Sequence, residues 1–243
     1  MNRQSPFSYI CNTCGLCCHD KMITLSPYDV LRLARAAGVS TREAIDRFTI
    51  RRGSILKFTG EGACVALDRV RCRVHSGRPL ACRLYPLGIE FIKNTDGEKF
   101  VMLEPAAGSL GVYGIEGDVN AFVEAQGVAP YLEANARYAS LLAVFRERIA
   151  TTADFDRVEP REFWRRAVRE ALAELNYDPN LLIDAMFDAR AVERVGIDDA
   201  EIVAAHIERL ARMIGSESNA ELLAAAAVML AVSLGQSPGA VMI

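Results

Sequence analysis

Three things are scarce in this 243-residue sequence: cysteine beyond Cys82, long apolar runs and excess positive charge. The segment from Leu222 to Leu234 carries no charge, but a membrane-spanning helix needs about 20 apolar residues, so we interpret the segment as a buried helix. The formal net charge is −3, whereas a general nucleic-acid-binding protein needs a basic surface to displace counterions. We therefore expect no membrane span and no nucleic-acid partner.

The first residues do not resemble a secretory signal. Arg3, Gln4, Ser5 and Pro6 stand where such a signal has an apolar stretch of about 7 to 15 residues. We therefore expect a cytoplasmic protein. In that reducing compartment, cysteines favour metal binding or redox chemistry over structural disulfides, and a total of seven leaves at least one thiol unpaired in any case.

Two common catalytic patterns are also missing from the sequence. There is no Gly-x-Gly-x-x-Gly fingerprint between a strand and a helix, which disfavours an ordinary nucleotide-binding fold. There are only three histidines, and no triad of serine, histidine and acid can be argued. We interpret His206 as a packing or surface residue within a helix. Asp198, Asp199 and Glu201 stand at a predicted helix start, where carboxylates complement the helix dipole.

All seven cysteines lie between residues 11 and 82, and four of them form one run, Cys11-x2-Cys14-x2-Cys17-Cys18, which we call the knuckle. Thiolates at this spacing can converge on one metal centre, because a short loop wraps around it. Thiolates bind zinc and iron, whereas calcium and magnesium take oxygen ligands. The candidate metal ligands are Cys11, Cys14, Cys17, Cys18, Cys64, Cys72 and Cys82.

The spacing leaves the identity of the metal open. The triplet of Cys11, Cys14 and Cys17 matches the first three positions of a bacterial ferredoxin run, although Cys18 follows at once. For zinc, the first pair is an ordinary knuckle that a downstream pair would complete, and two zinc ions would need eight ligands or bridging thiolates. His19 and His75 are the nearest substitutes for an eighth ligand. A centre of four cysteines would leave three thiols for a second centre or as free nucleophiles.

Arginines interleave with the later cysteines, so the cysteine region is basic while the rest of the chain is acidic. We interpret these guanidinium groups as offsetting buried thiolates, in preference to forming an anion-binding site. They are Arg69, Arg71, Arg73, Arg78 and Arg83.

The pattern of residues predicts an α+β fold with an irregular, cysteine-rich metal-binding region. Ser26 begins a helix that Gly38 ends, and Ser40 with Glu43 forms a capping box for a second helix that runs toward Arg51 or Arg52. Residues 58–83 should be irregular backbone packed against the knuckle. Residues 89–93 and 99–104 should form a β-hairpin around Asn94-Thr95-Asp96-Gly97.

The C-terminal half is predicted to be entirely helical. We expect helices at 119–127, 130–149, 160–175, 179–195, 198–214 and 219–234, with Ser218 and Glu221 at the start of the last, and Trp164 in a core or interface. The segment 104–118 contains four glycines and is the best candidate boundary. This gives a metal-binding domain at 1–108 and a helical domain at 119–243.

Three segments occur in a fixed order: Cys11-x2-Cys14-Gly15-x-Cys17-Cys18, then Gly62-x-Cys64-x2-Leu67, then Cys72-x-Val74-His75-x2-Arg78-Pro79-x2-Cys82-Arg83-x-Tyr85-Pro86. Over about residues 9–87 the chain resembles the CxxCxxCC cysteine-cluster family of the YkgJ type. Its members are described as zinc- or iron-chelating, or as iron–sulfur-cluster-containing proteins. His75 stands where the family often has tyrosine, which favours a structural role for it.

The resemblance extends to flagellin lysine N-methylases, which carry a similar cluster. The cysteine pattern gives the first and third of three hypotheses, and the resemblance alone implies the second. The first is a metalloprotein with an iron–sulfur cluster such as a 4Fe–4S centre, or with more than one metal centre, whose helical half offers a surface to a protein or peptide partner. The second is a lysine methyltransferase that uses S-adenosylmethionine. The third is a structural zinc module, in which metal binding supplies about 10 to 16 kcal/mol toward folding.

Overall fold

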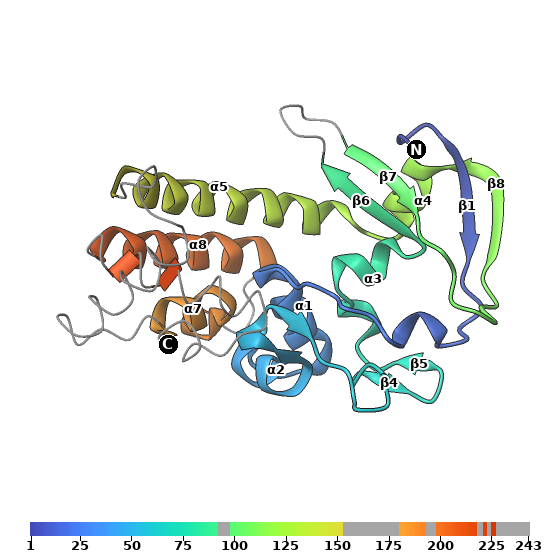
Figure 1. Cartoon of the computed structure of the whole chain (residues 1–243), viewed down its shortest axis with the longest axis horizontal. Helices are drawn as coiled ribbons and strands as arrows, with labels where there is room; N and C mark the ends of the chain where they lie inside the picture. The colour runs from blue at the N-terminus through green and yellow to red at the C-terminus, as the bar shows by residue number, and fades with distance from the viewer. Residues whose placement is uncertain (92–97, 153–179, 193–197, 218–220, 223–224, 227–243) are drawn as a thin grey trace, which may run out of the picture.

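The protein has an α+β architecture. The structure, a computed structural model, describes residues 1–91, 98–152, 180–192, 198–217, 221–222 and 225–226. The helices α5 (Ala129–Thr152), α7 (Asn180–Phe187) and α8 (Asp199–Ser216) lie together at one end, and the strands at 6–10, 87–91, 98–102 and 112–118 lie at the other (Figure 1). Between them are α1 (Pro27–Ala37) and α2 (Thr41–Phe48).

Side chains at their N-termini begin both α1 and α2. Ser26 accepts a hydrogen bond from the backbone N–H of Asp29, whose carboxylate accepts one from Ser26 in return, and Ser40 forms the same box with Glu43. Such a cap stabilises a helix by about 1 kcal/mol. Gly38 ends α1 in the left-handed conformation, as the sequence predicts.

Helix α2 ends earlier than predicted, at Phe48. Thr49 is extended, and its hydroxyl donates to the carbonyl of Ile45, which satisfies the last turn of the helix. Arg51 and Arg52 have positive φ angles, so neither continues the helix. They belong instead to the 3-10 turn η2 (Arg51–Gly53).

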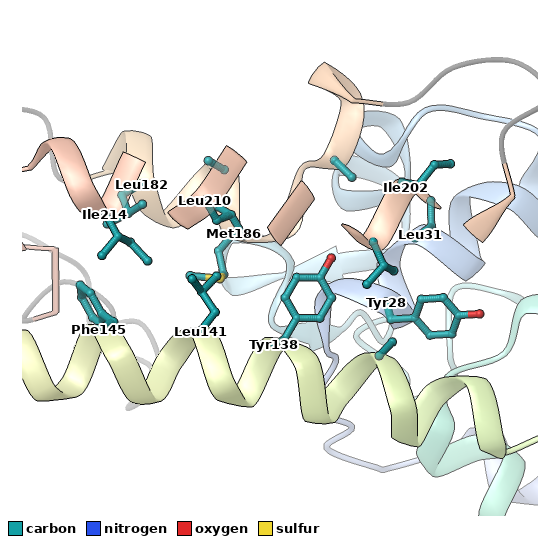
Figure 2. Packing of buried hydrophobic residues seen from close by; sticks show 14 of the residues in the cluster. Tyr28, Leu31, Tyr138, Leu141, Phe145, Leu182, Met186, Ile202, Leu210 and Ile214 are labelled. Atoms are coloured by element: carbon teal, nitrogen blue, oxygen red, sulfur yellow. The ribbon is translucent and has the colours of Figure 1, made fainter. Parts of the chain in front are cut away.

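One apolar core joins α1, α5, α7 and α8. Tyr138, Leu141 and Phe145 on α5 face residues of α7 and α8, as Figure 2 shows. Tyr28 of α1 joins the same core, with its ring 4.9 Å from that of Tyr131 at a steep angle. The core therefore ties the helix that follows the knuckle to the C-terminal helices.

The strands form antiparallel pairs in the part of the chain described. β6 (Leu87–Phe91) pairs with β7 (Glu98–Met102), which confirms the predicted hairpin, although the turn at 94–97 lies outside the described residues. β1 (Pro6–Ile10) pairs with β8 (Val112–Asp118), so the glycine-rich segment 104–118 that follows β7 ends in a strand. Short pairs join β2 (Thr49–Ile50) to β3 (Ile55–Leu56) and β4 (Leu67–Asp68) to β5 (Arg71–Cys72).

The cysteine-bearing segment 58–83 is mostly irregular, as predicted, and packs on the knuckle. It contains the 3-10 turn η3 (His75–Gly77) and leads into one short helix that the sequence did not indicate, α3 (Leu80–Leu84). The knuckle itself ends in the turn η1 (Leu16–Cys18). The backbone N–H of Cys64 donates to the carbonyl of Cys18 at 2.8 Å, and His19 pairs with Ala63 as an isolated bridge.

Where the structure describes the C-terminal half, helices occur in the predicted segments, but one of them is divided. α4 (Val119–Ala125) is capped by Asp118, and α8 is capped by Asp198. The helix predicted at 179–195 is divided, because Asp188 adopts an extended backbone between α7 and the 3-10 turn η4 (Ala189–Ala191). The helix predicted at 160–175, Trp164, and Ser218 at the start of the last helix lie outside the described residues.

Among the helices of the described ranges, none is both long and apolar enough to cross a membrane.

Candidate metal centre

The seven cysteines come from four stretches of chain that meet in space. Cys11 directly follows β1, and Cys17 and Cys18 form the end of η1. Cys64 is buried and pairs across an isolated bridge with Phe58. Cys72 ends β5, and Cys82 lies in the middle of α3. All seven are free thiols.

Six of these cysteines line one cavity of about 590 Å³: Cys11, Cys17, Cys18, Cys64, Cys72 and Cys82. The volume is within the range of about 300 to 1,000 Å³ that is typical of small-molecule and cofactor sites. Apolar and aromatic side chains, among them Leu33, Phe58 and Phe122, complete the walls. The cavity therefore combines a soft, sulfur-rich donor set with surroundings that limit the access of water.

Backbone hydrogen bonds link three of the thiol-bearing residues. Cys64 donates its N–H to the carbonyl of Cys18 and accepts through its own carbonyl from Leu67, at 2.8 and 2.9 Å. Leu67 is in turn the cross-strand partner of Cys72. Since these bonds do not depend on the thiols, the protein backbone holds Cys18, Cys64 and Cys72 around the cavity by itself.

Cys82 is positioned by contacts from α1 and α4. The carboxylate of Asp29 accepts the N–H of Leu80, the first residue of α3, at 2.7 Å. Arg83 donates to the carbonyl of Gln126 at 2.7 Å and to the carbonyl of Ser76. Its guanidinium carbon also lies 4.8 Å from the centre of the Tyr131 ring. The arginine after Cys82 therefore anchors α3.

The knuckle turns sharply between Cys14 and Cys17. Thr13 and Gly15 both have positive φ angles, and a Cβ on Gly15 would lie 3.2 Å from the Cα of Val70. The positive φ angle therefore favours glycine at residue 15, and a side chain there would also crowd Val70. Cys14, although described, is not among the residues that line the cavity.

The thiols influence one another electrostatically. Hydrogen bonding between Cys17 and Cys18, whose Sγ atoms are 3.9 Å apart, lowers the pKa of Cys17 and raises that of Cys18. Burial raises the pKa of Cys64, Cys72 and Cys82, and a negative charge on Cys17 raises all three further. These thiols cannot all ionise side by side unless a cation compensates them, which is what a thiolate-bound metal provides.

Cys14 has different surroundings. The backbone N–H groups of Leu110 and Leu16 lower the pKa of its thiol, and the hydroxyl of Ser109 acts in the same direction. These groups belong to the knuckle and to the loop before β8. They stabilise a thiolate at Cys14 by hydrogen bonding.

Each of the two histidines considered as ligands has a ring nitrogen close to a neighbouring group other than a thiol. His19 has its Nδ1 3.2 Å from the carbonyl of Gly15. His75 borders the cavity, but Nη1 of Arg78 lies 3.1 and 3.0 Å from its two ring nitrogens. Burial and the charge of Arg78 lower the pKa of His75. The structure thus engages both imidazoles in contacts within their own turns.

The cysteine thiols are spread around the cavity wall and do not converge on a single position. Within the ranges described, no group of three or more His, Cys, Asp or Glu side chains is arranged to hold a metal ion. The donor chemistry fits zinc or an iron–sulfur cluster, and binding would draw the thiols inward from the cavity wall.

Tyr9, Tyr85 and Gln126 also line the cavity, although the sequence did not mark them as site residues, and Arg78 lines it as well. The ring centres of Tyr9 and Tyr85 are 6.2 Å apart, and Nη2 of Arg78 donates to Gln126 at 2.6 Å. Arg78 and Tyr85 are part of the Arg-Pro-x2-Cys-Arg-x-Tyr-Pro run, which was the available signal. Tyr9 and Gln126 lie outside this run, and no sequence pattern marked either of them as a cavity residue.

Comparison with known families matches residues 10–100 to the model CxxCxxCC, described as "Putative zinc- or iron-chelating domain". The matched segment contains every cysteine of the chain and ends in β7. A comparison with curated proteins and another with solved structures gave no significant match. The cysteine-bearing segment is therefore similar to a metal-chelating domain.

Proposed function

We propose that the protein is a metalloprotein that holds an iron–sulfur cluster in its cysteine cavity, and that the centre supports the modification of a protein or peptide. One observation carries the first part: six thiols from four stretches of chain line a single cavity of about 590 Å³. A single zinc ion and a common iron–sulfur cluster each take four thiolates, but the iron and inorganic sulfide of a cluster occupy more of such a cavity than one ion does.

The residues that would hold the cluster are Cys17, Cys18, Cys64, Cys72 and Cys82, with Cys11 at the opening. A bound cluster would supply electron transfer or activation of a cofactor or substrate. The chain contributes apolar walls that exclude water and a rigid frame of hydrogen bonds around the thiols. Burial and the charge of Arg83 lower the pKa of Arg78, while Cys82 and Cys72 oppose this, so the guanidinium lies near enough to these two thiols to contribute positive charge to them.

A structural zinc module is the second candidate. The Sγ atoms of Cys17 and Cys18 are 3.9 Å apart, close to the edge of a zinc–thiolate tetrahedron, which is about 3.8 Å for bonds of 2.3 Å. This distance favours joint ligation of one ion by the two neighbouring thiolates. Metal binding would then chiefly stabilise the irregular segment 58–83.

Methyl transfer from S-adenosylmethionine, a partner surface on the helical half and a cytoplasmic location stay predictions. The first is tested by calorimetric titration of the metal-loaded protein with S-adenosylmethionine. Binding at a 1:1 ratio would support it, and no heat above dilution would exclude it.

The test of the cluster is purification without oxygen, followed by analysis of iron, zinc and acid-labile sulfide. Iron and sulfide in equal amounts, with absorbance near 400 nm, support the cluster. A colourless protein with stoichiometric zinc and no iron supports the zinc module instead.

A further inference from the structure

The arginines that interleave with the later cysteines differ in what their charges act on. Burial raises the pKa of Cys72, and the charges of Arg78 and Arg73 oppose this effect. These two arginines therefore offset a thiolate, as predicted from the sequence. Arg69 and Arg71 are exposed and are not among the groups that act most strongly on the thiols lining the cavity. Their charges are available to a partner.

Arg69 and Arg71 lie at the tip of a tight hairpin. Asp68 pairs with Arg71 across β4 and β5, so Arg69 and Val70 form a two-residue turn between the strands. Arg69 has a φ angle of 54°, in the left-handed region that glycine and asparagine adopt at lower cost. The turn itself therefore gives no reason for an arginine at this residue, which favours a role at the surface.

The tip of this hairpin stands at the mouth of the cysteine cavity. Val70 lines the cavity, as do Lys21 and Met22, which follow the knuckle, and all three are exposed. The knuckle contacts the tip, since a Cβ on Gly15 would lie 3.2 Å from the Cα of Val70. In Figure 1 the β4–β5 hairpin lies next to the dark blue turn of the knuckle. We call this surface the basic rim: Lys21, Met22, Arg69, Val70 and Arg71.

The rim carries positive charge that nearby carboxylates do not neutralise. In the part of the chain that the structure describes, its three basic side chains form no ion pair with a carboxylate, although Asp68 stands opposite Arg71 in the hairpin. The carboxylate of Asp20 lies against Gly62 instead. Among the described residues that line the cavity, Glu104 is the only acidic one.

The rim also exposes apolar side chains between its charges. Met22 and Val70 are 76% and 49% exposed. A protein segment with apolar side chains among carboxylates matches both the charge and the apolar surface. Single-stranded nucleic acid matches it less well, because such a ligand stacks its bases on accessible aromatic rings. No aromatic side chain is exposed among the residues whose burial the structure describes.

We propose that the basic rim is a docking surface for an acidic segment of a partner protein or peptide. Carboxylates of the segment pair with Lys21, Arg69 and Arg71, and its apolar side chains contact Met22 and Val70. This inference rests on the proposed function, because it names the class of protein or peptide that is presented to the centre in the cavity. Attraction between opposite charges steers the segment to the cavity mouth and weakens as salt is added.

Fluorescence anisotropy tests the preference for acidic segments. The probe is a fluorescein-labelled peptide in which Glu-Glu-Leu-Ser is repeated three times, and the matched probe has Lys in place of each Glu. The protein is the full chain, purified without oxygen. We expect the acidic probe to bind at least tenfold more tightly than the basic probe at 50 mM NaCl, and to lose at least fivefold in affinity at 300 mM NaCl. Equal affinity for the two probes would overturn the proposal.

Charge-reversal variants locate the binding. Arg69→Glu with Arg71→Glu should weaken binding of the acidic probe at least tenfold, and Lys21→Glu with Arg71→Glu should do the same while leaving the turn residue Arg69 in place. The control is Lys99→Glu with Arg212→Glu, which changes the net charge equally at two exposed side chains of β7 and α8. It should keep the affinity within about twofold. Equal weakening in the control would show that net charge alone decides, and would refute the assignment to the rim.

A fluorescein-labelled oligothymidine with the same charge as the acidic peptide tests the other class of partner. If it binds through the rim more tightly than the acidic peptide, nucleic acid is the occupant and the proposal is wrong. Iron, zinc and sulfide are measured in every sample, which separates the two inferences. A protein that holds metal without preferring the acidic peptide contradicts the docking surface alone, and one that binds this peptide through the rim without holding metal contradicts the proposed function alone.

Discussion

The carboxylate of Asp29 joins two helices that are far apart in the sequence, because it accepts the backbone N–H of Leu80 at 2.7 Å. The same carboxylate accepts the N–H and the hydroxyl of Ser26, both at 2.7 Å. One buried side chain thus caps α1 and fixes the first residue of α3, which carries Cys82. Stability and metal binding should therefore be coupled at this residue.

Replacement of Asp29 by alanine leaves the N–H groups of Ser26 and Leu80 without their acceptor in a buried place. We expect a loss of about 2 to 4 kcal/mol in the free energy of unfolding, from two unsatisfied donors and one lost cap. Metal should also be lost more readily, as α3 becomes loose. Urea unfolding and the rate of metal release to a chelator measure the two effects.

The control for this change is Glu43→Ala, which removes the equivalent carboxylate from the capping box of α2. Glu43 is exposed, and its hydrogen bonds stay within the first turn. We expect a loss of about 1 kcal/mol or less and unchanged metal release. If both variants release metal at the wild-type rate, the role given to Asp29 is wrong.

Gly77 lies where η3 approaches α1 most closely. A Cβ at this residue would be 2.0 Å from the carbonyl oxygen of Arg32, a backbone atom of a helix that cannot yield. Gly77→Ala should therefore destabilise the protein by about 2 to 4 kcal/mol and displace the turn before α3. Gly60→Ala is the matched control, since nothing lies within 4 Å of its Cβ, and it should change stability by less than about 1 kcal/mol. Thermal unfolding of the pair decides the point, and equal melting temperatures would contradict it.

Arg83 uses the planar fork of its guanidinium, which lysine lacks. Arg83→Lys should lose at least one of the two bonds to the carbonyls of Ser76 and Gln126, together with stacking on Tyr131, at a cost of about 1 to 3 kcal/mol. Arg73→Lys, at an exposed arginine with one bond to the carbonyl of Val65, should cost less than about 1 kcal/mol. Guanidinium chloride denaturation compares the two, and similar midpoints would show that Arg83 contributes only its charge.

His206 should make the stability of the helical half depend on pH. Its Nε2 donates to the carbonyl of Ala185, so its Nδ1 accepts from the hydroxyl of Tyr138, both at 2.8 Å. Burial lowers the pKa of His206, and the charge of Arg209 adds to this, while the carbonyl of Ala185 and the charge of Asp188 oppose it. Between its unfolded pKa, about 6.5, and its lower folded pKa, His206 is protonated more in the unfolded state than in the folded state. The free energy of unfolding should therefore decrease as the pH is lowered through this window.

The measurement for His206 is urea unfolding at pH 7.5 and pH 5.5 for the wild type and for His206→Gln. Glutamine keeps polar groups in the same place and does not titrate in this range. We expect the wild type to lose more stability than the variant on acidification. An equal loss in both proteins would assign the effect to other groups.

Sequence patterns predicted the elements whose signals are local. The N-cap at Ser26 and the capping box of Ser40 with Glu43 depend on residues within one helical turn, and the β6–β7 hairpin on two neighbouring strands. The pairing of β1 with β8 joins residues about a hundred apart and left no such signal, so the segment 104–118 was interpreted as a boundary.

For the cysteine site, too, the sequence predicted the local features and not the long-range ones. Spacing in the sequence correctly indicated that segment 58–83 packs on the knuckle, through the Cys18–Cys64 backbone bond. It did not indicate which way each side chain points, because the positive φ angles at Thr13 and Gly15 decide that. The position of Cys14 outside the cavity lining therefore could be found only from the structure.

The central claim is that the thiols around the cavity hold an iron–sulfur cluster. It is tested most directly by purifying the wild type and Cys17→Ala without oxygen and measuring iron, zinc, sulfide and the absorbance from 300 to 600 nm. We expect a brown wild type with iron and sulfide in equal amounts, and a variant that has lost most of both, because Cys17 lies beside the other cavity thiols. A colourless wild type with stoichiometric zinc and no iron, or a variant with undiminished iron and sulfide, would contradict it.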